Sequence, residues 1–264
     1  MEVKALKFGG LTAKRPIVQG GMGVGVSLSS LAGNVAKCGG IGTISGVHPG
    51  YREADFKENP FRANLRAIGN ELEKAKEIAN GGIIGFNFMT VMNHYEEYVK
   101  EAIAAGADFI VSGAGLPVNL AKYAAGTRAA ILPIVSSARA LKLIVKQWQR
   151  ADRLPDAVVV EGPLAGGHLG YPYGHLVDGT FDTLEDSLVD VVDYVRELEE
   201  KNGVIIPVIA GGGVRSHADM ERLMALGASG VQVGTKFVAT EECDAAPAFK
   251  QAYLRSRKED VQLI

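Results

Sequence analysis

The chain has 264 residues, of which 47% are hydrophobic and 22% charged, and its formal net charge is −2. This balance excludes a disordered or fibrous protein, and the absence of a basic stripe excludes a charged surface built for nucleic acid. No run of about 18 apolar residues exists to span a bilayer, and the N-terminal segment lacks an apolar signal core, so we expect a cytoplasmic protein without a membrane partner.

The first predicted element is a small hairpin over Leu6–Thr12, turning at Gly9-Gly10, which we expect to close the bottom of the fold. Eight short runs follow that are rich in Val and Ile and apolar on both faces, as strands of a covered parallel sheet are. These runs are Pro16–Gln19, Ile41–Ile44, Ile83–Asn87, Phe109–Val111, Ala130–Val135, Ala157–Glu161, Pro207–Ala210 and Gly230–Val233.

A helical pattern, with apolar residues three and four positions apart, follows each run. The predicted helices are one capped by Ser27 and stopped by Gly39, then Asn64–Ala79, Tyr95–Ala105, Val118–Ala125, Ala138–Gln149 with Trp148 in the core, Leu184–Glu200, one capped by Ser216 and ended by Gly227, and Ala246–Arg255. Eight strand–helix units without a break in composition predict an α/β protein, a single-domain (β/α)8 TIM barrel over residues 1–264. An open doubly wound sheet is the alternative.

Two classes of site find no support in the sequence. Cys38 and Cys243 form no C-x-x-C pair, so we expect both to be small buried side chains in a reducing compartment. No H-x-x-x-H, H-E-x-x-H or carboxylate cluster predicts a metal site, and no G-x-S-x-G predicts a serine hydrolase.

Glycine is unusually frequent and accounts for 33 of the 264 residues. In an ordinary protein it makes up only about 7% of the residues. Many follow predicted strands, where the working loops of a barrel lie. Gly211, Gly212 and Gly213 follow the seventh strand, and Gly234-Thr235 follows the eighth. Loops at these two positions bind phosphate through backbone N–H groups in many barrels. The sequence therefore predicts a phosphate site, with simple tight turns as the alternative.

His168 is the strongest candidate for proton chemistry, because it stands in a glycine-flanked loop after the sixth strand and imidazole exchanges protons near neutral pH. A surface or structural histidine is the alternative. The polar stretch Leu169–Asp182 beyond it is either a lid or a solvated loop. Glu161 is the one acid that ends a predicted strand, and a single acid does not define a site.

Four motifs in order along the chain resemble the nitronate monooxygenase (2-nitropropane dioxygenase-like) family, whose superfamily includes the FMN-dependent enoyl-ACP reductase. The motifs are Pro16-Ile17-Val18-Gln19-Gly20-Gly21-Met22, Gly166-Gly167-His168, Ala210-Gly211-Gly212-Gly213-Val214 and Gly230-Val231-Gln232-Val233-Gly234-Thr235-Lys236-Phe237. The resemblance covers about residues 6–240. Pro163-Leu164 and Leu169 differ from the usual residues around the histidine motif.

This resemblance implies FMN as the cofactor of the barrel. It implies that Gly21, Met22 and Asn87 contact the isoalloxazine and ribityl region and that Gly167 lies beside the flavin. It places the phosphate on Gly211, Gly212, Gly213, Gly234 and Thr235. It places His168 at the reactive face of the flavin, as the base for neutral nitroalkanes.

The expected function is oxidation of small alkyl nitronates with O2 to a carbonyl compound and nitrite. An NAD(P)H-dependent enoyl-thioester reductase on the same flavin is the alternative, followed by a barrel that binds a phosphate ligand without flavin. No metal or nucleic acid is expected, and a homodimer is open. Because family members usually continue past the apolar end at 261–264, we also expect that a C-terminal segment is missing.

Overall fold

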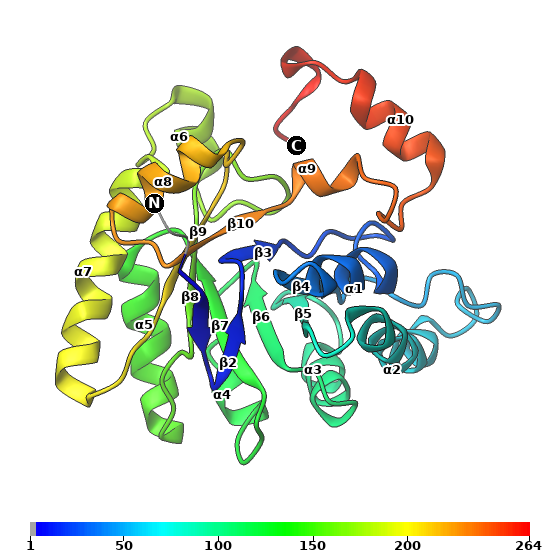
Figure 1. The fold of residues 1–264 in the computed structure, drawn as a ribbon, viewed down its shortest axis with the longest axis horizontal. Helices are drawn as coiled ribbons and strands as arrows, with labels where there is room; N and C mark the ends of the chain where they lie inside the picture. Colours follow the sequence, from blue (N-terminus) through cyan, green and yellow to red (C-terminus); the bar gives the residue numbers. More distant parts are fainter. Residues whose placement is uncertain (1–3) are drawn as a thin grey trace.

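The computed structural model describes residues 4–264 and contains a closed barrel of eight parallel strands (Figure 1). Each strand pairs with its neighbours in sequence, and the last pairs with the first, which confirms the predicted (β/α)8 barrel. The strands of the barrel are β3 (Ile17–Gln19), β4 (Ile41–Ser45), β5 (Ile83–Met89), β6 (Phe109–Gly113), β7 (Ala130–Val135), β8 (Val158–Glu161), β9 (Val208–Gly211) and β10 (Gly230–Val233).

Helices surround the barrel and bury their apolar stripes against it (Figure 1). The covering helices are α1 (Ser29–Lys37), α2 (Pro60–Ala79), α3 (Tyr95–Ala104), α4 (Leu120–Tyr123), α5 (Ala138–Trp148), α7 (Leu184–Asn202) and α8 (His217–Ala225). Two short helices, α6 (Tyr173–Asp178) and α9 (Thr235–Val238), lie in loops, and α10 (Pro247–Arg255) stands outside the barrel near the C-terminus. Short 3-10 helices cover Gln149–Ala151 and Lys258–Asp260.

Alternation of side chains along the strands separates two cores. Along β8, Val158 and Val160 belong to the core between barrel and helices, whereas Val159 belongs to the core inside the barrel. The predicted hairpin, β1 (Leu6–Phe8) and β2 (Leu11–Ala13), contributes Leu6 and Phe8 to that inner core, so it closes one end of the barrel as expected. The opposite end is left for the loops that follow the strands.

Several predicted helix boundaries were wrong. Helix α2 begins at Pro60 rather than Asn64, because Asn59 caps it through a hydrogen bond from Arg62 N to Asn59 Oδ1 (3.1 Å). Helix α4 is a single turn, Leu120–Tyr123, shorter than the predicted Val118–Ala125. Trp148 is fully buried, as predicted, and its Nε1 donates to Pro117 O at 2.8 Å.

The prediction for Cys38 was also wrong. Cys38 is exposed, whereas Cys243 is buried as expected. The buried positions of α1 include Leu31, Ala32 and Val35. Cys38 would continue this spacing, but it lies one residue past the last helical residue, where the chain turns away at Gly39, and its side chain is exposed.

The N-terminus of α1 is capped by residues distant in sequence rather than by the predicted Ser27. Asp244 accepts hydrogen bonds from the backbone N–H groups of Leu28 (2.9 Å), Ser30 (3.2 Å) and Leu31 (3.0 Å). Glu71 accepts one from Ser29 N at 2.9 Å. These carboxylates satisfy the orphan donors of the first turn and complement the helix dipole. Burial raises the pKa of the Asp244 carboxyl, against the lowering effect of these hydrogen bonds.

Replacing Asp244 by Ala is therefore expected to lower the free energy of unfolding by about 1–2 kcal/mol, because it orphans several buried N–H donors at once. Urea unfolding followed by circular dichroism measures the change. Asp190→Ala, at an exposed position on α7, is the matched control and should stay within about 0.5 kcal/mol of the parent. Equal stabilities of the two variants would refute the capping role of Asp244.

Candidate active site

The loops that carry the predicted site residues meet at the carboxyl end of the barrel, because all eight strands run parallel. Alternation along each strand decides which side chains point inward there. Ile41, Ile83 and Val159 belong to the inner core, so the residues two or four positions further along the same strands also face inward. Above this apolar plug, inward positions include the polar residues Thr43, Asn87, Glu161 and Gln232, together with Gly211. We call this layer the barrel mouth.

The structure brings Gly21 and Asn87 together at the mouth. A Cβ on Gly21 would overlap the Asn87 side chain and stand 3.3 Å from Thr43 Cγ2. Beside them, the Thr43 hydroxyl is buried and has no hydrogen-bond partner within residues 4–264. Buried hydroxyl groups are nearly always paired. The mouth therefore contains a buried hydroxyl whose hydrogen-bonding capacity no described residue uses.

Met22 links the first and last loops of the barrel. Its Sδ lies 3.4 Å from the point where a Cβ on Gly234 would stand. The loop of Met22 is held by Ser27, whose hydroxyl accepts a hydrogen bond from Met22 N (3.0 Å) and whose N–H donates to Met22 O (2.9 Å). Ser27 therefore stabilises this loop and does not cap α1. Thr235 is exposed at the start of α9.

The glycines after β9 adopt backbone angles that other residues rarely adopt. Gly212 and Gly213 have φ of +104° and +80°. A Cβ on Gly212 would also stand 3.1 Å from the backbone N and O of Gly162, and one on Gly213 would stand 3.2 Å from Leu164 Cβ. The turn therefore needs glycine for its own conformation and for its contact with the loop after β8. Phosphate binding by this turn stays a prediction.

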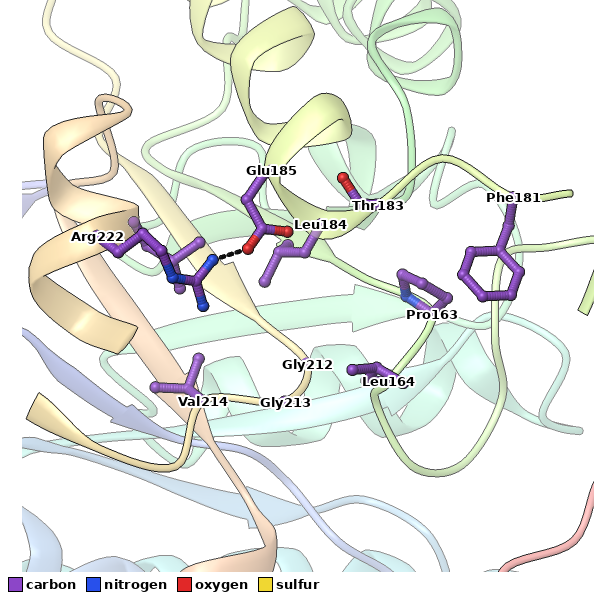
Figure 2. A pocket seen from close by; sticks show the side chains of 11 residues that line it. Pro163, Leu164, Phe181, Thr183, Leu184, Glu185, Gly212, Gly213, Val214 and Arg222 are labelled. Carbon is purple, nitrogen blue, oxygen red and sulfur yellow. Dashed lines mark ion pairs between the residues drawn. The ribbon is translucent and has the colours of Figure 1, made fainter. Parts of the chain in front are cut away.

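A pocket of about 190 Å³ lies behind this turn, between the loop after β8, the first turn of α7, and Arg222 and Leu223 of α8 (Figure 2). Gly212 and Gly213 line one wall. Arg222 also lines it, but its guanidinium pairs with Glu185, as Figure 2 shows, and with Asp219 at 3.1 Å. The remaining walls are largely apolar, from Pro163, Leu164, Phe181 and Leu184. Because Glu185 and Asp219 balance the charge of Arg222, the pocket on this side of the turn is a largely apolar recess.

The loop that carries His168 is fixed at its far end. Ser136 Oγ donates to Gly170 O at 2.8 Å, and Tyr171 OH donates to Glu161 O at 3.3 Å. His168 itself is exposed, and the neighbouring Gly167 has open space around its Cα and a φ of +89°. The start of this loop packs against the Gly212 turn at Gly162 and Ala165, and within residues 4–264 the His168 imidazole makes no hydrogen bond or ion pair. Its role as a base stays a prediction.

Sequence reasoning missed three polar side chains of the mouth, Thr43, Glu161 and Gln232. Each lies an even number of residues from a position facing the interior, and that parity is a signal the sequence carries once the strand ends are known. From the sequence, Glu161 is only a single acid at a strand end. Burial raises the pKa of its carboxyl to about 7, and no hydrogen bond or ion pair within residues 4–264 offsets this.

Two further properties concern the part of the chain that the structure describes. None of its helices has the length and apolar character needed to cross a bilayer. No group of three or more His, Cys, Asp or Glu residues in 4–264 is placed to hold a metal ion.

Comparison with known proteins gives consistent matches. The family model described as nitronate monooxygenase matches residues 4–264. A probable nitronate monooxygenase from Staphylococcus saprophyticus is 25% identical over 98% of this chain and 75% of its own length. FabK from Thermotoga maritima superposes with a TM-score of 0.70 at 26% identity, over 92% of this chain. The chain spans only 65% of that FabK chain. Nitroalkane oxidase from Streptomyces ansochromogenes, at 23% identity and a TM-score of 0.64, shares the fold over 90% of this chain and 70% of its own.

Proposed function

The chain belongs to the nitronate monooxygenase family, an oxidoreductase family, and on that premise we propose that it is an FMN-dependent enzyme that oxidises small alkyl nitronates with O2 to a carbonyl compound and nitrite. The observation that carries the proposal is the barrel mouth, where an orphaned buried hydroxyl at Thr43 adjoins Gly21 and Asn87. These residues come from the loop after β3 and from the two strands that follow it, β4 and β5, and they lie at the end of the barrel where barrel enzymes bind their ligands.

The residues present fit FMN. Gly21 lets the loop after β3 pack directly against Asn87, and the Thr43 hydroxyl beside them supplies an unused donor and acceptor. The turn of Gly211, Gly212 and Gly213 and the Gly234-Thr235 loop would hold the phosphate through backbone N–H groups. Gly167 would lie beside the ring, since the space around it is open. Met22 would hold the first loop against Gly234.

When bound, FMN supplies the electron transfer to and from the substrate. The chain's own residues position the reactants and move protons. A ring nitrogen of His168 would accept the α-proton of a neutral nitroalkane, which produces the anion that is oxidised. The anchors at Ser136 and Tyr171 would keep this loop in place over the mouth. A substrate supplied as the nitronate needs no such proton transfer.

An enoyl-thioester reductase is the second candidate, supported by the likeness to FabK from Thermotoga maritima. Leu164 and Leu169 border the His168 loop with apolar side chains, which suits an acyl chain as well as a small nitroalkane. The two candidates share the cofactor site and differ in the partner that reduces the flavin.

Anaerobic titration of the FMN-loaded protein separates them. With propionate-3-nitronate or ethylnitronate, we expect the visible flavin absorbance to bleach within the mixing time of a stopped-flow experiment, and NADH or NADPH should leave it unchanged. Admission of O2 should then restore the absorbance and release nitrite. Bleaching by NAD(P)H followed by reoxidation with crotonyl thioester would establish the reductase instead.

A further inference from the structure

A small apolar cluster, separate from the two main cores, joins the first and last loops of the barrel. It lies where the barrel closes, because β3 pairs with β10. The buried members are Val26, Val238, Cys243 and Ala245, and Met22 packs against them. We call these five residues the seam cluster. It connects the loop after β3 with the segment after β10, and both are assigned to FMN in the proposed function.

Hydrogen bonds reinforce the seam cluster from the side of the last segment. Asp244 N donates to Val26 O at 3.2 Å, and Cys243 Sγ donates to the same oxygen at 3.4 Å. The other half of the loop after β3 is held by Ser27, whose hydroxyl accepts from Met22 N at 3.0 Å. The position of Met22 therefore depends on how firmly the segment after β10 grips this loop.

Two residues of the loop after β4 fasten the same two segments from outside. Arg52 Nε donates to Tyr51 OH at 2.7 Å, and Arg52 Nη2 donates to Asp244 O at 2.6 Å. Tyr51 lies against Gly25 of the loop after β3, since a Cβ on Gly25 would overlap the phenol. We call this pair the Tyr51–Arg52 strap. It connects the loop after β4 with the segment after β10 and packs on the loop between them.

The strap suits control of a loop better than stabilisation of the whole fold. A guanidinium presents several N–H donors in a fixed fork, so Arg52 can hold two acceptors at once. Arg52 is exposed, and hydrogen bonds at the surface contribute little to global stability. Local opening of a loop, in contrast, is governed by the few contacts that fasten it. Loss of the strap should therefore loosen the loop after β3 in a protein that remains folded.

We propose that the Tyr51–Arg52 strap positions the flavin site by fixing the loop of Gly21 and Met22 against the segment after β10. The proposal rests on the proposed function, because it takes FMN as the ligand. Tyr51 and Arg52 are positioning residues that act through Gly25 and Asp244 and not through contact with the flavin. A loop that is already ordered lowers the entropy cost of binding, so the strap should strengthen FMN binding.

The test compares Arg52→Gln with the parent protein. In the FMN-free protein, backbone amides of residues 20–28 should exchange with deuterium about tenfold faster in the variant, as measured by mass spectrometry. FMN affinity from fluorescence quenching should fall about tenfold, which is the size of one lost hydrogen bond to a charged group. At saturating FMN, the visible circular dichroism of the bound flavin should also change, whereas a merely structural role would leave it unaltered.

Two further variants make the result specific. Arg62→Gln removes an exposed arginine from α2 and should match the parent in amide exchange and FMN affinity. Tyr51→Phe keeps the ring on Gly25 and removes the hydroxyl that Arg52 binds, so its effects should be smaller than those of Arg52→Gln. The double variant should match Arg52→Gln alone, because the hydroxyl acts through Arg52. Additive effects would contradict this coupling.

The outcomes separate the strap from the flavin site. Amide exchange and FMN affinity of Arg52→Gln equal to those of the parent would overturn the strap. Faster exchange with unchanged FMN affinity and circular dichroism would overturn its positioning role. Failure of the parent to bind FMN would overturn the proposed function and the positioning role with it, while the exchange experiment, which needs no FMN, would still decide whether the strap holds the loop.

Discussion

Replacement of His168 by Asn is expected to lower the turnover of neutral nitroethane by about 100-fold or more, while turnover of pre-ionised ethylnitronate stays within a few-fold of the parent. The difference follows from the proton that must leave the α-carbon before oxidation. His168 lies in an exposed glycine-flanked loop that is anchored through Gly170 and Tyr171, so its imidazole has room to meet a substrate above the mouth. Asn keeps the polarity and size of the side chain and removes the base.

Steady-state oxygen consumption with each substrate form measures the ratio. His175→Asn, on the exposed helix α6, is the matched control, because it removes an imidazole from the same stretch without touching the anchored loop. It should leave both rates near those of the parent. If His168→Asn lost turnover of nitroalkane and nitronate equally, the imidazole would act in binding or orientation and the assignment as base would fail.

The second large effect is expected at the turn after β9. Replacement of Gly212 by Val should weaken FMN binding by more than about 100-fold, because a side chain there takes a φ of +104° and stands 3.1 Å from the Gly162 backbone. Both changes displace the N–H groups that would hold the phosphate. Loss of several backbone hydrogen bonds to a charged group accounts for an effect of this size.

Gly106→Val supplies the matched control for backbone strain. Gly106 has a comparable φ of +93° with no atom within 4 Å of an added Cβ, and it ends the turn after α3, away from the mouth. Gly106→Val should lose about 1–2 kcal/mol of stability in thermal unfolding from its backbone conformation, and Gly212→Val should lose at least as much because its side chain also meets the Gly162 backbone. Only Gly212→Val should lose FMN affinity in the fluorescence titration. Equal affinities of the two folded variants would show that the turn does not hold the phosphate.

The barrel fold could be predicted from the sequence because its strands are covered on both faces and are therefore apolar on both faces. Runs such as Ala130–Val135 are apolar throughout, and their number and spacing leave few alternatives. The N-terminal cap of α8 could also be predicted from the sequence. The Ser216 side chain accepts a hydrogen bond from Asp219 N, and the Asp219 side chain accepts one from Ser216 N, three residues away. Signals of this kind lie within one turn of the chain.

What the sequence could not indicate depends on partners far along the chain. Asp244 caps α1 from more than 200 residues away, so local sequence favours a nearby serine such as Ser27 for that role. The carboxyl pKa of Glu161 follows from burial, which no local pattern encodes. Its inward direction required the exact end of β8. The candidate site was thus predicted at the level of its glycine loops, and its inward-facing polar layer emerged only from the barrel geometry.

A titration of the parent protein with FMN tests the central claim most directly. Absorbance between 300 and 550 nm and flavin fluorescence are recorded together until saturation. We expect one FMN per chain, a resolved and shifted flavin spectrum and strong quenching of the free-flavin fluorescence. A protein that stays colourless after FMN addition and gel filtration, with fluorescence equal to that of free FMN, would contradict a flavin site in this barrel.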